Sequence, residues 1–117
     1  MDLKKIKFND EQKQKYLELF NKLTQSLIKS ENIGQANAII KLYSLLGENN
    51  PDFLKYINSV DIWGGSGAVW EVYIENKVDD VEFKKSIIEL IDLMEETNIL
   101  TKSIKSRKRL FLNDLKS

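Results

Sequence analysis

The apolar residues between positions 9 and 30 recur at helical spacing, and this pattern constrains the fold more than any other feature of the chain. Lysines and glutamines fill the positions between them, so one face of the expected helix is apolar and the other is polar. Asn9 or Asp10 is placed to cap its N-terminus. The apolar positions, spaced by four, three and four residues, are Tyr16, Phe20, Leu23 and Leu27.

Two more helices are expected before the middle of the chain. The first covers residues 32–46, and Gly47 is placed to end it because glycine adopts the left-handed conformation that closes many helices. Its expected apolar face consists of Ala36, Ile39, Ile40, Tyr43 and Leu46. Asn50 followed by Pro51 indicates the start of a short helix that reaches about residue 60.

The second half of the chain has a less regular pattern. A helix is expected over residues 79–96, where Asp79 and Glu82 fit a capping box, and another over 101–117 with Ile104, Phe111 and Leu115 on one side. Residues 69–75 alternate between apolar and polar types, which is typical of a strand, but no partner strand is evident. They would pair with a second copy, pair with an unrecognised stretch, or form a helix.

These patterns predict a mainly α fold. We expect one small helical domain over residues 1–117, with four to five helices and one short strand or extended segment, about 69–75, after a Gly-rich turn. No apolar run is long enough for a secretory signal or a membrane span, so a cytoplasmic protein is expected.

The composition removes most catalytic chemistry. The chain has no cysteine and no histidine, so it lacks thiol nucleophiles, the commonest general base and the preferred ligands of transition metals. No spacing of serines, lysines or carboxylates forms a catalytic group. We therefore expect no enzyme activity, no catalytic residues, no cofactor and no metal site.

The charges are unevenly distributed although the net charge is zero. Residues 71–96 contain nine acids against three lysines, a sum of −6, and residues 97–117 contain six bases against one acid, a sum of +5. Complementary surfaces within one fold or dimer explain this distribution, and a surface that faces a partner is the alternative. A basic run at 102–109 is too short, in a chain of zero net charge, to predict nucleic-acid binding.

The stretch DIWGGSGAVWEVYIEN, residues 61–76, contains three of the five glycines and both tryptophans. Gly64, Gly65 and Gly67 resemble a phosphate-binding loop only in composition, since no lysine follows them and the expected helix comes before the loop, not after it. A tight turn that lets the aromatic residues pack is favoured, and a loop that contacts a ligand or partner is the alternative.

The same stretch supplies the candidate binding residues. Tryptophans are commonest in cores, yet large aromatics beside carboxylates also form the centres of interfaces. A solvated acidic face is the simpler interpretation of the carboxylates. The functional interpretation is a partner-binding strip over residues 61–80, composed of Asp61, Trp63, Trp70, Glu71, Tyr73 and Glu75.

The residues WGGSGAVWE resemble a family of small uncharacterised bacterial proteins with a W-G-G-x-G-S-type turn. The resemblance covers Trp63, the three glycines and Glu71, whereas Ala68 stands where the family has serine and Glu71 where aspartate is usual. Some members are associated with toxin-immunity systems, and the resemblance implies a bacterial protein of that kind.

These observations favour a non-catalytic binding protein that masks a basic partner, such as a nuclease toxin, through the strip at 61–80. The alternatives are a structural homodimer or adaptor that pairs through Val69–Glu75, and a small-ligand protein that uses the turn Gly64–Gly67.

Overall fold

The computed structural model describes residues 8–63, 69, 72–99, 104, 108–110 and 112–113, with only the backbone at positions 60 and 61. Within this part the chain forms five helices and no strand, which confirms the mainly α fold class. Three helices are long: α1 (Asp10–Lys29), α2 (Ile33–Gly47) and α5 (Lys77–Glu96). Two are short: α3 (Asp52–Ile57) and α4 (Val60–Trp63).

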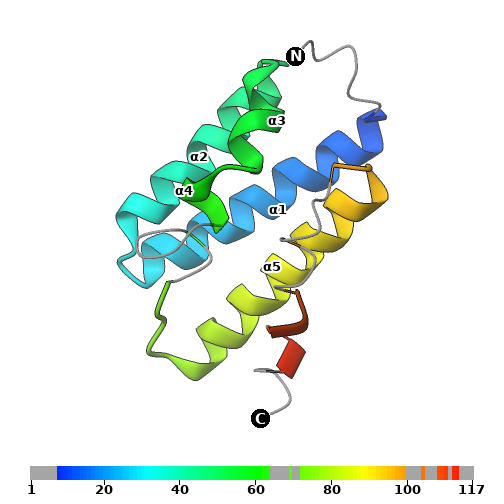
Figure 1. Ribbon diagram of the computed structural model, residues 1–117. Helices are drawn as coiled ribbons and strands as arrows, with labels where there is room; N and C mark the ends of the chain where they lie inside the picture. Colours follow the sequence, from blue (N-terminus) through cyan, green and yellow to red (C-terminus); the bar gives the residue numbers. More distant parts are fainter. Residues whose placement is uncertain are drawn as a thin grey trace.

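Helix α1 is the centre of the arrangement, because both other long helices pack against it (Figure 1). Helix α5 runs antiparallel to α1, as three contacts along their length show. Near one end the Tyr16 hydroxyl bonds the Thr97 hydroxyl at 2.7 Å, and near the other Lys29 Nζ bonds Asp79 Oδ1 at 3.1 Å. Between them, Lys22 pairs with Glu89 at 3.6 Å. The short helices α3 and α4 pack against α2.

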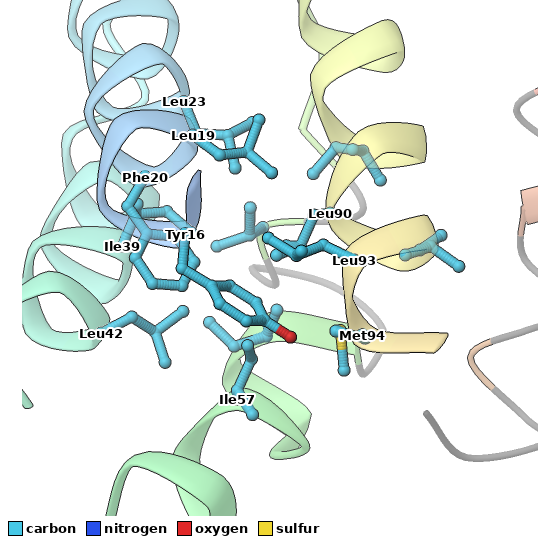
Figure 2. Close-up of a cluster of buried hydrophobic side chains, with 14 of the residues drawn as sticks. Tyr16, Leu19, Phe20, Leu23, Ile39, Leu42, Ile57, Leu90, Leu93 and Met94 are labelled. Carbon is cyan, nitrogen blue, oxygen red and sulfur yellow. The ribbon is translucent and has the colours of Figure 1, made fainter. Parts of the chain in front are cut away.

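The core lies where these helices meet, and its side chains come from every helix. Figure 2 labels members from α1, α2, α3 and α5. The expected stripe of α1 is confirmed, since Tyr16, Phe20, Leu23 and Leu27 are all fully buried. Tyr16, Phe20 and Phe53 pack with ring centroids 5.8 to 6.1 Å apart, at tilted or edge-on angles that suit aromatic quadrupoles.

Asparagine side chains cap the starts of α1 and α5. Asn9 forms a capping box with Gln12, in which its Oδ1 accepts from the Gln12 amide at 2.7 Å. At α5 the cap is Asn76, whose Oδ1 accepts from the Asp79 amide at 3.0 Å. The predicted Asp79–Glu82 box was therefore wrong. The helix begins two residues earlier than expected, so Asp79 lies inside its first turn.

All three long helices end in the same backbone motif. The amide two residues past each cap returns to a carbonyl five residues back, from Asn32 to Leu27, Asn50 to Leu45 and Ile99 to Met94, at 2.8 to 2.9 Å. The left-handed residues are Glu31, Asn49 and Asn98, with φ of 65°, 55° and 62°. Gly47 does not end α2 in the way predicted, because Asn49 supplies the left-handed residue two positions later.

The expected apolar face of α2 was only partly right. Ala36, Ile39 and Leu46 are buried as expected, but Ile40 is 43% exposed and Tyr43 is 46% exposed. Leu42, which was not expected inside, is fully buried. The exposed polar residues Asn37, Lys41 and Ser44 recur at spacings of four and three and mark the outward side of α2, and Ile40 lies among them although it is apolar.

Two expectations fall in the second half of the chain. Residues 72–75 adopt neither helix nor strand, and Val69, the other described position of the predicted strand, lies in a 3₁₀ turn and is fully buried. No strand forms at the described positions of this segment. Of the predicted fifth helix, positions 104, 108–110 and 112–113 are helical, and Ile104 is buried as expected. Phe111 and Leu115 lie outside the described residues.

Candidate binding surface

The connection that leads into α5 exposes an aromatic side chain to solvent. Tyr73 is 79% exposed and its neighbour Glu75 is exposed, whereas Ile74 between them is 5% exposed and packs against the core. The alternation predicted from the sequence therefore holds at these three positions. Asn32, in the turn between α1 and α2, donates from Nδ2 to the Tyr73 carbonyl at 3.3 Å. This bond attaches the connection to the neighbouring turn.

A hollow of about 420 Å³ lies between that turn and the start of α5. Lys29 and Asp79 line it and bond each other at 3.1 Å, so their charges cancel. Glu31 and Glu75 also line it, are exposed, and form no ion pair with any described residue. The hollow therefore carries a surplus of negative charge. The other lining residues are Ser30, Ile74 and Asn76.

Tyr73 and Val78 are the two most exposed large apolar side chains in the described part of the chain, at 79% and 71%. They are five residues apart, on either side of the point where α5 begins. Glu82 is exposed one turn beyond Val78 on the same side of α5, and it too has no ion pair among the described residues. We call the residues Glu31, Tyr73, Glu75, Val78 and Glu82 the Tyr73 surface.

Trp63 does not belong to this surface. Its side chain is 3% exposed, and its indole Nε1 donates to the Ile57 carbonyl at 2.7 Å. The bond satisfies the one polar atom of a buried tryptophan and ties α4 to the end of α3. Of the two readings that the sequence left open for Trp63, core and interface, the structure therefore supports the core.

The remaining candidate residues are not placed. Trp70, Glu71 and the turn glycines Gly64, Gly65 and Gly67 lie outside the described residues, and for Asp61 the structure describes only the backbone, within α4. The structure thus brings together Tyr73 and Glu75 from the predicted strip, and adds residues that the strip did not include.

Glu31 and Val78 are the additions that the sequence did not single out. Glu31 is far from Tyr73 in sequence and reaches the same surface only through the turn between α1 and α2. Val78 carried a signal, because it is an apolar residue in the first turn of α5 that does not fit the spacing of the buried residues Phe83, Ile87 and Leu90.

The acidic and basic segments of the chain meet in one described contact. Lys108 forms an ion pair with Asp92 on α5. Asp92 lines a second hollow, of about 340 Å³, between α1 and α5. This contact joins the basic end to the acidic helix within one chain, as the simpler interpretation of the charge pattern expects.

The described side chains include many carboxylates and one fully buried phenol, that of Tyr16. No three carboxylates among them lie close enough to hold a metal ion. The Tyr16 phenol has a pKa raised well above its ordinary value, chiefly because burial disfavours the charged form, so it stays protonated and serves as a hydrogen-bond donor. No helix in the described part is both long and apolar enough to cross a membrane.

Comparisons with models of known protein families, with curated proteins and with solved structures found no match to this chain.

Proposed function

We propose that this chain is a non-catalytic binding protein, of the bacterial immunity type, that masks a basic protein partner with the Tyr73 surface. The observation that carries the proposal is the exposure of Tyr73 and Val78, at 79% and 71%, beside carboxylates that have no ion pair in the described part of the chain. When a partner covers an aromatic side chain that the fold leaves in water, the free energy of the system falls, and this favours binding.

The charge of the surface supports a basic partner. Three of its five residues are glutamates, and the one lysine in the adjoining hollow, Lys29, already bonds Asp79. A lysine or arginine of a partner would find Glu31 and Glu75 without an ion pair to any described side chain, with the exposed Lys77 as the one lysine close to Glu75 in sequence. Such complementarity raises the association rate and disfavours acidic partners.

Site-specific photocrosslinking in the native cell tests the proposal. A photoreactive amino acid replaces Tyr73 in one variant and Glu48, an exposed residue that follows α2, in the other. We expect one protein of basic isoelectric point to crosslink at position 73 and not at position 48. Equal labelling at the two positions, or a partner that is acidic, would contradict the proposal.

A matched pair of charge reversals then measures the contribution of the surface. Glu75→Lys and Glu48→Lys each reverse one exposed glutamate. We expect Glu75→Lys to weaken binding of the crosslinked partner about tenfold or more at low salt, and Glu48→Lys to change it less than about twofold. Tyr73→Ala should weaken it about thirtyfold, the loss typical of an interface hot spot. Unchanged affinity in both Glu75→Lys and Tyr73→Ala would place the partner elsewhere on the chain.

A further inference from the structure

The outward face of α2 presents to solvent a straight seam of uncharged residues that includes two exposed isoleucines. Ile33 and Ile40 are 52% and 43% exposed, although isoleucine is among the residues most often buried. The exposed residues along this line recur at intervals of four, three, four and three, the spacing at which two helices pack side by side. They are Ile33, Asn37, Ile40, Ser44 and Gly47, and we call this line the α2 seam.

The seam is almost free of charge. Eight residues of α2 are exposed, and only Lys41 among them is charged. The Lys41 ammonium lies 4.2 Å from the centroid of the Tyr56 ring on α3, so it is drawn to the α3 side of the helix. Tyr43, 46% exposed, adds apolar surface at the opposite margin. A face of this kind buries surface against another protein without stripping water from charged groups.

We propose that the α2 seam binds the α2 seam of a second copy of this chain, in antiparallel orientation. A two-fold axis brings one patch against itself, so every charge near the axis meets its own sign. That condition excludes most of the exposed helical surface of this protein, including the charged outward face of α5. The α2 seam meets it, because none of its five residues is charged.

The sizes of the seam residues favour the antiparallel register. With the two-fold axis between Asn37 and Ile40, Ile33 of one copy lies opposite Ser44 of the other, and Asn37 lies opposite Ile40. Each layer therefore pairs a large apolar side chain with a smaller one, which lets the two helices approach closely. A parallel pair would place Asn37 against Asn37 and Ile40 against Ile40, leaving layers of unequal width.

The small size of the α2 seam limits the expected affinity of the dimer. Helix α2 has 15 residues and is therefore about 22 Å long. One such helix pair buries less than the roughly 1,600 Å² of a standard stable interface. We therefore expect a weak dimer, which forms at protein concentrations on the order of tens of micromolar.

Sedimentation velocity from about 1 to 500 µM protein tests this inference. We expect the wild-type chain to shift from monomer to dimer across that range, and Ile40→Lys to remain a monomer throughout. The lysine points outward, so a circular dichroism spectrum and melting temperature close to wild type should accompany the loss. A wild-type chain that stays monomeric at 500 µM overturns the proposal.

Tyr73→Lys is the matched control, because it places the same charge on an exposed apolar residue outside the seam. The proposal requires that this variant dimerise as the wild type does. Loss of the dimer in Tyr73→Lys would instead indicate pairing through the segment around residues 69–75, and would overturn the assignment to α2.

The register has its own test, made simple by the absence of cysteine from the chain. Asn37→Cys and Ile40→Cys are prepared separately, mixed in equal amounts at high concentration and oxidised. The antiparallel register predicts that the mixed disulfide exceeds both homodisulfides. A statistical mixture, or an excess of homodisulfides, contradicts that register. Glu82→Cys, on the outward face of α5, should give the background level of random oxidation.

Discussion

Helices α2 and α5 pack against the same central helix, but their outward faces are opposite in character. Each has eight exposed residues in the described structure; one of those on α2 is charged, and seven of those on α5 are. Their inward faces are alike, with fully buried residues such as Ile39 and Leu42 on α2 and Leu90 and Ile91 on α5. A helix needs only its inward face to join this fold, so the outward face of α2 is free to serve another purpose.

The first prediction tests the likeness of the inward faces, and it has the largest expected effect. Ile39→Ala on α2 and Leu90→Ala on α5 each remove a fully buried side chain. We expect each to lower the free energy of unfolding by about 2–5 kcal/mol, through lost burial and the cavity left behind. Urea denaturation measures both. A large loss at one site with almost none at the other would mean that only one of these helices belongs to the cooperative core.

The second prediction concerns a polar contact between α1 and α5. Tyr16 is fully buried, and its hydroxyl bonds Thr97 Oγ1, which in turn donates to the Leu93 carbonyl at 2.8 Å. Thr97→Val keeps the shape but leaves the Tyr16 hydroxyl unpaired, at a cost of about 1–3 kcal/mol. Tyr16→Phe should cost less, because Thr97 keeps its bond to Leu93. The reverse order in urea denaturation would show that this hydroxyl finds another partner.

The burial of Tyr16 predicts sensitivity to alkali. Burial raises the pKa of Tyr16 in the folded state, whereas an unfolded tyrosine ionises near its ordinary value of about 10. The stabilisation is therefore complete below pH 10 and is lost as the pH rises above it, by about 1.4 kcal/mol per unit. Tyr16→Phe should flatten this part of the curve relative to wild type. An identical alkaline loss in both proteins would assign it to other groups.

The third prediction compares the ends of the helices. Asn49 after α2 and Asn98 after α5 hold the left-handed conformation that asparagine tolerates, and Glu31 holds it after α1 without that tolerance. Asn49→Ala and Asn98→Ala should each destabilise the fold by about 1 kcal/mol. Glu31→Gly should stabilise it by roughly 0.5–1 kcal/mol. If Glu31 serves the Tyr73 surface, the same change should weaken binding of the partner.

The positions of the long helices were mostly predicted from the sequence. Helix α1 was located to within one residue at each end, because its apolar stripe and its Asn9 cap are both local signals. The end of α2 was misassigned to Gly47, since glycine is the commonest left-handed residue and asparagine the less common one. Helix α4 was missed, because four residues are too few to show a period.

Exposure was harder to predict than secondary structure. Ile40 and Tyr43 were assigned to the core because of their residue types and spacing, yet both are exposed. The packing of the whole helix decides which side of α2 faces α1. For Trp63 the sequence left both core and interface open, because a large aromatic residue beside glycines occurs in both, and the structure buries it. Residues 73–75 alternate as the sequence does, with Tyr73 and Glu75 exposed and Ile74 buried, although the strand predicted from that alternation does not form at the described positions.

The last prediction concerns the outward faces themselves, where the expected effects on the monomer are smallest. Glu89→Gln removes an ion pair with Lys22 whose two side chains are more than half exposed, so it should cost at most about 0.5 kcal/mol. Ile40→Gln should cost a similar amount, because the better helix propensity of glutamine offsets part of the lost burial.

Protein concentration should separate the two variants. A dimer is favoured by mass action, so the melting temperature of the wild type and of Glu89→Gln should rise between about 5 and 500 µM protein. That of Ile40→Gln should stay constant, because the residue it replaces lies at the middle of the α2 seam. Differential scanning calorimetry at both concentrations measures this. A rise in all three proteins, or in none, would mean that the uncharged face of α2 has no part in assembly, and that its contrast with α5 must be explained within the monomer.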